Sequence, residues 1–127
     1  MGNFQNLAEI LQHITRAVPA NAPAVKPLAI GQDIAAAVVR SASADGLHRQ
    51  PNHEELLIVL EGEGDFQVGE ETRPIKAGDF VFVPRDAVHG TVATRVEPLT
   101  YLSMISPRID LQKDVIWHDQ PPKFQVV

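Results

Sequence analysis

After Pro27 the chain is a succession of short apolar runs separated by turn residues, and this pattern limits the fold more than any other feature. Several short strands spaced about ten residues apart are typical of an all-β sandwich or barrel, rather than of βαβ units with helices between strands. The breaks between the runs carry Asp45-Gly46, Gly62, Gly69, Gly78-Asp79 and Pro84. The expected strands cover residues 34–40, 55–61, 64–68, 72–76, 79–83, 88–94 and 97–105.

Residues 3–17 instead repeat apolar side chains at helical spacing, which predicts a short amphipathic helix before the strands. Pro19 and Pro23 end this pattern and indicate a linker. We therefore expect an N-terminal helix and linker over residues 1–22, and a single β domain with a C-terminal tail over residues 23–127. The apolar face of the helix would be formed by Phe4, Leu7, Ala8, Leu11 and Ile14.

Composition excludes several classes of protein. A chain of 127 residues fits one domain, and the absence of cysteine excludes disulfides, thiolate metal sites and a cysteine nucleophile. The net charge of −5 and the scattered Lys and Arg residues argue against nucleic acid as a partner. The sequence shows neither a secretory signal pattern nor a run of about 18 apolar residues, so we expect no membrane contact and a cytoplasmic location.

Two of the expected strands are apolar at every position. In Leu56–Leu60 and in Phe80–Val83 both faces of the strand carry apolar side chains, whereas a half-exposed strand would alternate. A small barrel buries its outer face only against a helix, a tail or another subunit. The pattern therefore predicts a homodimer, and it places Phe66, Phe80 and Phe82 in buried positions.

Residues that bear chemistry stand at the starts of strands. His48 and Gln50 have the same parity, so their side chains leave one face of a strand. Glu55 opens the next run on the face that it shares with Leu57, and His89 begins a later strand. Imidazole and carboxylate groups are ligands for first-row transition metals, which makes these residues candidates for a metal site.

The segments around these residues resemble the two motifs of the cupin superfamily (RmlC-like cupins). The first motif is a histidine, one residue, a second histidine, three or four residues, a glutamate, six residues and a glycine. It is matched by His48, Glu55 and Gly62. The second motif is a glycine, five residues, a proline and, a few residues on, a histidine, and it is matched by Gly78, Pro84 and His89. The resemblance spans residues 34–106.

This resemblance implies a fold and a cofactor. Cupins are antiparallel β-barrels, or double-stranded β-helices of the jelly-roll type, with three histidines and one glutamate pointing inward. In the superfamily these residues bind Fe, Mn, Ni, Zn, Co or Cu. Here His48, Glu55 and His89 are the implied ligands, a set that suits a divalent ion with open positions for water or substrate.

Gln50 stands where the second histidine of the motif belongs. Its amide oxygen is expected either to be a weaker fourth metal ligand or to hydrogen-bond a metal-bound water. His53 shares the parity of Glu55 and is an alternative ligand, although a histidine on a turn is more often solvated. Asp86 and Ala93 also depart from frequent cupin residues, with consequences for turn geometry and packing only.

Two further residues are weaker candidates for a catalytic role. Arg40 ends an apolar strand, where it would either bind a substrate carboxylate or be solvated. Tyr101 shares one face of the last strand with Ser103, and it would be either an acid or base or a buried structural tyrosine.

Together these features predict a small cupin that binds a small organic molecule, such as a sugar or a carboxylic acid. The favoured interpretation is a metal-dependent enzyme of isomerase, lyase or dioxygenase type. A non-catalytic module that binds a metabolite or a metal is the alternative. A cupin without metal, in which His48, Glu55 and His89 hydrogen-bond one another, would also satisfy these polar groups.

Overall fold

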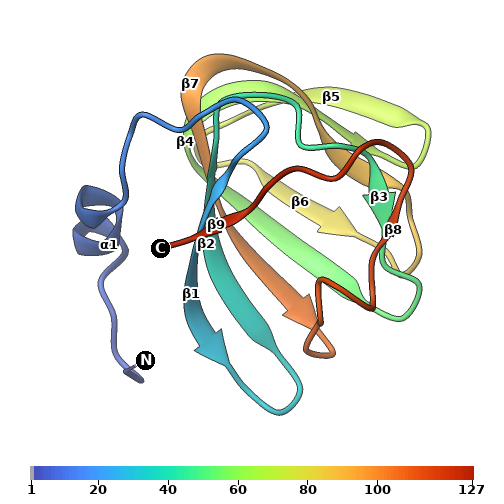
Figure 1. Cartoon of the computed structure of the whole chain (residues 1–127), viewed down its shortest axis with the longest axis horizontal. Coiled ribbons are helices and arrows are strands. Elements are labelled where there is room, and N and C mark those ends of the chain that lie inside the picture. Colours follow the sequence, from blue (N-terminus) through green and yellow to red (C-terminus); the bar gives the residue numbers. More distant parts are fainter. Residues whose placement is uncertain (1) are drawn as a thin grey trace.

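A computed structural model describes residues 2–127 as one curved, mainly antiparallel sheet with a short helix on its outer side (Figure 1). The helix α1 covers Leu7–His13. The strands are β1 Ala24–Ile30, β2 Ala35–Ser41, β3 His48–Arg49, β4 Glu54–Val68, β5 Glu71–Lys76, β6 Phe80–Val83, β7 His89–Ser106, β8 Ile116–Trp117 and β9 Gln125–Val126. The expected strands at 34–40, 72–76 and 79–83 correspond to β2, β5 and β6 within one residue at each end.

The sheet rolls up without closing, so the barrel expected from the sequence is correct only in outline. Its strand order is β5-β4-β7-β2-β1-β9, with β6 paired to β4, and with β3 paired to β7 and β8. Within residues 2–127 the edge strands β5 and β9 do not pair with each other. The reason is that β4 pairs with β6 along its first half and with β5 along its second, which leaves β5 as a free edge.

Strands β4 and β7 are each continuous where the sequence predicted two strands. They pair with each other from Glu54↔Ser106 to Val68↔His89, with register shifts between Val59 and Phe66. Such bulges bend a strand and increase its twist without ending it. Gly62 lies within this bend at φ +83°, and a Cβ atom there would overlap the carbonyl oxygen of Pro98. The turn residues therefore mark a bend in one strand.

Strand β1 was not expected, because Pro19 and Pro23 indicated a linker and the first expected strand began at residue 34. Pro27 has no N–H to donate, yet it is tolerated because β9 pairs only with Ala24 and Val25 on that side of the strand. On the other side a bulge between Pro27 and Ala29 adjusts the register with β2.

Helix α1 is shorter than residues 3–17. It begins after Asn6, whose side chain accepts a hydrogen bond from the backbone N–H of Glu9 at 3.0 Å, and the chain is extended again at Ile14. Phe4 lies before the helix and is 98% exposed, so its expected place on the apolar face was wrong. Among residues 2–127 there is no helix long and apolar enough to cross a membrane.

Arg40 joins the helix to the sheet and is fully buried. Its guanidinium donates to the carbonyl oxygen of Ile14 at 2.7 Å and to Thr100 Oγ1 at 3.0 Å, and it pairs with the carboxylate of Glu61. A buried cation at the C-terminal end of a helix is favourable because unpaired carbonyl groups point at it. The expectation that Arg40 binds a substrate or is solvated was therefore wrong, because β2 turns it outward beneath the helix.

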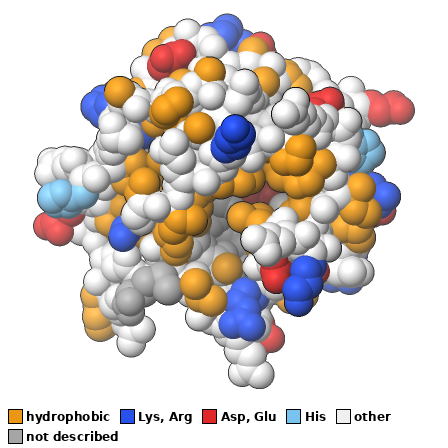
Figure 2. Space-filling view, in the orientation of Figure 1, with side chains coloured by type: hydrophobic (Ala, Val, Ile, Leu, Met, Phe, Trp, Pro, Cys, Tyr) orange, Lys and Arg blue, Asp and Glu red, His pale blue; other side chains and the backbone are white. Residues whose placement is uncertain are grey.

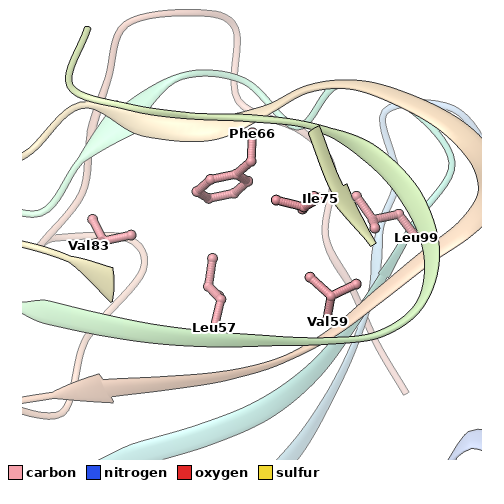
Figure 3. Packing of buried hydrophobic residues seen from close by; sticks show 6 residues of the cluster. All are labelled: Leu57, Val59, Phe66, Ile75, Val83 and Leu99. Atoms are coloured by element: carbon pink, nitrogen blue, oxygen red, sulfur yellow. The ribbon is translucent and has the colours of Figure 1, made fainter. Parts of the chain in front are cut away.

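The core is divided between the two faces of the sheet. Inside the roll, an apolar cluster lies between the strands (Figure 3) and consists of Leu57, Val59, Phe66, Ile75, Val83 and Leu99. Outside, Leu7, Ile10 and Leu11 of helix α1 pack against a second buried cluster, which consists of Ile14, Ala24, Leu28 and Val38.

Phe80 and Phe82 were expected to be buried, but they are 61% and 47% exposed. Alternation in β6 sends Val81 and Val83 towards the inner cluster and the two phenylalanines outward. They pair with Ile58 and Leu56 of β4, so an apolar strip runs along the outer surface of β4 and β6.

Replacing Gly62 by alanine tests the bend in β4. The new Cβ would clash with the backbone of Pro98, and a left-handed alanine is strained, so we expect the free energy of unfolding to fall by at least about 3 kcal/mol. Gly69→Ala is the matched control, because Gly69 has φ +60° but open space around it. It should cost only about 1–2 kcal/mol. Equal losses in urea denaturation would contradict the steric explanation.

Candidate active site

A cavity of about 250 Å³ lies inside the roll, between the inner faces of β1, β2, β4 and β7. The chain beyond β7 crosses the face of the molecule drawn in Figure 1 on its way to β9, and Ile109, Leu111 and Phe124 from this segment contribute to the wall. On the same face the surface is hollowed between hydrophobic side chains (Figure 2). The polar lining residues are Asp45, His48, Gln50, Glu55, His89, Thr91, Tyr101 and Ser103.

Four residues predicted from the sequence reach this one cavity. His48 and His89 are opposite each other in the β3–β7 pair, and their rings are 4.3 Å apart. Glu55 enters from the start of β4, and Gln50 follows β3. The structure thus brings together His48, Gln50, Glu55 and His89, which are separated by up to 41 positions in the chain.

Glu55 and His89 form the central contact of the cavity. His89 Nε2 lies 3.0 Å from Glu55 Oε1, and Ser103 Oγ donates a hydrogen bond of 2.6 Å to Glu55 Oε2. His89 Nδ1 lies 2.9 Å from the carbonyl oxygen of Ala87, which can only accept, so Nδ1 carries a proton. A neutral His89 would then turn a lone pair towards a carboxylate oxygen. The geometry therefore needs a proton or another cation between Nε2 and Oε1.

Burial and hydrogen bonding have opposite effects on Glu55. Burial alone would raise the pKa of Glu55, but the hydrogen bond and positive charge of His89 and the hydrogen bond from Ser103 outweigh it and lower this pKa. Glu55 is therefore a carboxylate at neutral pH although it is only 7% exposed. A buried anion of this kind attracts a proton-bearing imidazole or a metal cation.

His48 is held as a neutral imidazole. Burial, followed by repulsion from His89, lowers its pKa to about 4. Its Nδ1 lies 3.0 Å from the carbonyl oxygen of Gly46, and its ring packs against Trp117 at 4.6 Å. The proton on Nδ1 is thus fixed by the backbone, and the lone pair on Nε2 remains free.

Gln50, the departure from the cupin motif, is 3% exposed, and its Oε1 atom has no hydrogen-bond partner. A buried amide oxygen without a partner is unfavourable, and it marks a place where a donor or a cation would be stabilised. Nevertheless, across residues 2–127 no three or more His, Cys, Asp or Glu side chains are gathered in an arrangement that could hold a metal ion. Glu55 and His89 instead contact each other directly.

Comparison with known proteins identifies the family. The sequence profile of the Cupin domain family matches residues 38–105, which is more than half of the chain. The chain belongs to the cupin family. The segment matched contains His48, Glu55 and His89, together with most of β2 and all of β4 to β6.

Solved structures agree with this fold. TT1209 from Thermus thermophilus is 23% identical, with a TM-score of 0.73 over 85% of this chain and 100% of that chain. An uncharacterised Klebsiella pneumoniae protein with a double-stranded β-helix domain is 18% identical, with a TM-score of 0.72 over 94% and 100%. The DMSP lyase DddQ from Ruegeria pomeroyi is 28% identical, with a TM-score of 0.58 over 69% and 44%. The comparison with curated protein sequences finds no match.

His53 is not part of the cupin cavity. It is 6% exposed, so it is not solvated, and its Nε2 lies 3.8 Å from Asp114 Oδ2 in the segment after β7. It is absent from the residues that line the cavity, whereas Gln50, three positions before it, is among them. The alternative in which His53 replaces the missing histidine as a ligand therefore receives no support from its position.

Tyr101 lines the cavity beside Ser103, as their shared parity predicted. Burial, followed by the negative charges of Asp45 and Glu55, raises the pKa of Tyr101 well above its usual range. Its phenol therefore keeps its proton at neutral pH and is available as a hydrogen-bond donor.

Asp45 and Thr91 are cavity residues that sequence reasoning missed. Asp45 preceded Gly46 in what was read only as a turn, and Thr91 lay within an expected strand without any distinguishing motif. They meet because the backbone N–H of Asp45 donates to the carbonyl oxygen of Thr91 at 3.0 Å. No local signal could have shown this contact, since it joins positions 46 residues apart.

Replacing Asp45 by asparagine tests its burial. Burial raises the pKa of Asp45 from 3.8 to about 6. The folded state therefore holds a proton that the unfolded state releases, and wild-type stability falls as the pH rises between these values. Asparagine is neutral throughout, so the stability of D45N relative to wild type should increase by up to about 3 kcal/mol between pH 3.5 and pH 7. Urea denaturation at both pH values measures this, and a constant difference would contradict it.

Proposed function

We propose that this cupin is a metal-dependent enzyme of lyase or isomerase type, acting on a small organic molecule in the cavity. His48 and His89 would hold the ion through Nε2 and Glu55 through its carboxylate, with the Gln50 amide oxygen as a weaker fourth ligand. The observation that carries the proposal is the orientation of the two imidazoles. Both have Nδ1 against a backbone carbonyl oxygen, which leaves Nε2 for a cation.

The donor atoms suit a first-row divalent ion. His89 Nε2 and Glu55 Oε1 are 3.0 Å apart, about the separation of neighbouring donors that each lie about 2.1 Å from one ion. Gln50 Oε1 lacks a partner that such an ion would supply. The low pKa of His48 keeps its imidazole unprotonated, as a ligand must be.

A bound divalent ion would act as a Lewis acid that polarises a carbonyl group of the substrate. The other roles in the site would be carried out by residues of the protein. Ser103 holds the Glu55 carboxylate, the carbonyl oxygen atoms of Gly46 and Ala87 hold the imidazoles, and the apolar walls exclude water. The protonated phenol of Tyr101 is placed to donate to an oxygen atom of the substrate. The name of DddQ, a DMSP lyase, supports the choice of a lyase among cupin activities.

A metal-free acid–base enzyme is the second candidate, and the direct contact between Glu55 and His89 favours it. In this alternative the proton between Nε2 and Oε1 is the one that moves to and from the substrate, with the imidazole as its carrier. The non-catalytic alternative, a binding module, would use the same cavity without turnover.

Metal titration of the apo protein by calorimetry separates these alternatives. We expect one divalent ion per chain, with Mn²⁺, Fe²⁺, Co²⁺, Ni²⁺, Cu²⁺ and Zn²⁺ tested in turn. His89→Ala should weaken binding at least about 100-fold because a ligand is lost. Gln50→His should strengthen binding about tenfold or more, because imidazole is a better ligand than a neutral amide.

His53→Ala and His13→Ala are matched controls, since the first is buried outside the cavity and the second is exposed on α1. Both should bind metal as wild type does. If wild type takes up no ion, the metal proposal is wrong, and the acid–base enzyme and the binding module remain. If His89→Ala binds as tightly as wild type, the ligand assignment is wrong.

The homodimer is a separate proposal, supported by the apolar strip on the outer surface of β4 and β6. Phe80 and Phe82 lie there beside the half-buried side chains of their partners in β4, Ile58 and Leu56. We expect wild type to sediment as a dimer and Phe80→Lys with Phe82→Lys to sediment as a folded monomer, because a charge in an apolar interface is unfavourable. A monomeric wild type in analytical ultracentrifugation would contradict this proposal.

A further inference from the structure

The metal proposal uses only one part of the cavity. Asp45 and Thr91 also line it, and each carries a side-chain oxygen without a partner: Asp45 Oδ2 and Thr91 Oγ1. Asp45 is 6% exposed and Thr91 is 2% exposed. Polar atoms at such positions are usually paired, so two unpaired ones that are joined through their backbones call for an explanation.

Strand alternation shows which way these two side chains face. Thr91 has the parity of His89 in β7, so both leave the inner face of the sheet. Asp45 is held by Ser41, which donates a hydrogen bond of 2.6 Å to Oδ1 and has the parity of the cavity residue Val39 in β2. Both residues also border a wider recess of about 590 Å³, whose other lining residues include 20–22 and 119–123. Thr91, and Ser41 which holds Asp45, both lie on the inner face of the sheet. The groups that pair with Asp45 Oδ2 and Thr91 Oγ1 are therefore expected in the cavity.

The pair of free atoms has a definite hydrogen-bonding preference. A carboxylate oxygen accepts, and a threonine hydroxyl both donates and accepts. A hydroxyl group can donate to Asp45 Oδ2 and accept from Thr91 Oγ1 at the same time. A keto oxygen only accepts hydrogen bonds, so it would leave Asp45 Oδ2 unpaired. An ammonium group only donates them, so the hydroxyl hydrogen of Thr91 would have no acceptor on it.

The charge of the cavity excludes acidic ligands. Among the residues that line it there is no Lys or Arg, while Asp45 and Glu55 are both carboxylic acids. With a divalent ion bound, the two carboxylates balance the charge of the ion. Without it, the proton between His89 and Glu55 balances one carboxylate, and Asp45 leaves the cavity negative. In either case an anionic ligand would enter a low-dielectric site that offers no unbalanced positive charge.

We infer that Asp45 and Thr91 form a subsite for a hydroxyl group, and that the ligand of this cupin is an uncharged, polyhydroxylated molecule of the size of a pentose or hexose. A cavity of about 250 Å³ is slightly smaller than the usual range for ligand sites, which begins at about 300 Å³, and this fits a molecule of that size. The apolar side chains Val39 and Phe66 in the wall would contact the carbon atoms of its ring. This inference deepens the proposed function, but it requires only the cavity and not the metal.

Titration followed by NMR tests the inference, because it detects weak binding and locates it. The probes are D-ribose, D-xylose and D-glucose, with D-glucuronate as the charged counterpart of glucose. We expect at least one neutral sugar to shift the backbone amide signals of Asp45 and Thr91 below about 100 mM. D-glucuronate should bind at least about tenfold more weakly than D-glucose.

Variants then assign the hydroxyl contact. Thr91→Val keeps the shape of the side chain and removes its hydroxyl, and it should weaken sugar binding about fivefold to tenfold. Asp45→Asn, which replaces the free acceptor by a donor, should weaken it at least as much. Thr72→Val is the matched control on the exposed strand β5, and it should bind as wild type does.

Each possible outcome is decisive. The subsite is overturned if Thr91→Val binds the sugar as wild type does, and the ligand class is overturned if glucuronate binds as well as glucose or if no neutral sugar binds. Titrations with and without Zn²⁺ separate this inference from the metal proposal. A protein that takes up none of the six divalent ions but binds sugar at Asp45 and Thr91 would refute the metal proposal alone.

Discussion

The contact between Glu55 and His89 depends on how far β4 bends. Glu55 pairs with Ile105 near one end of the β4–β7 ladder, and His89 pairs with Val68 at the other. In a straight strand the 13 steps from position 55 to position 68 would span about 40 Å. The two side chains nevertheless meet at 3.0 Å, so the paired strands must curl back on themselves. The bulges around Gly62 lie in this curl, and the contact at the centre of the cavity depends on it.

The curl also separates an apolar half of the interior from a polar one. Near the bend, Val59, Ile75 and Leu99 fill the roll with closely packed side chains. Towards the strand ends, the polar residues gather around the cavity, and Phe66 contacts both regions because its ring also lies 6.3 Å from that of His89. Burial beside an apolar core raises the pKa values of Asp45 and Tyr101 and lowers that of His48, since the charged form of each loses its hydration. At Glu55 the contacts with His89 and Ser103 outweigh this effect. The structural core and the chemistry of the site are thus parts of one packed interior.

How much the sequence could reveal depended on the range of the interactions involved. Strand parity and the spacing within each cupin motif are local features. They were sufficient to predict that His48, Gln50, Glu55 and His89 share one cavity. The turn signals at Gly62 were real, but glycine in a bulge and glycine in a hairpin look alike in one sequence, so β4 was divided in two. Arg40 was misjudged because its partners, the carbonyl groups after α1 and the carboxylate of Glu61, lie more than 20 positions away. Asp45 and Thr91 were missed for the same reason.

The segment after β7 closes the wall of the cavity, and this affects which parts of the site can change independently. Ile109, Leu111 and Phe124 line the cavity, and Trp117 packs on His48. The strands of this segment, β8 and β9, have only two residues each, and most of it is a surface loop. Loops vary in sequence more readily than the sheet to which they are attached. Substitutions in this segment can therefore reshape the space for a ligand while the strands that carry His48, Glu55 and His89 stay the same.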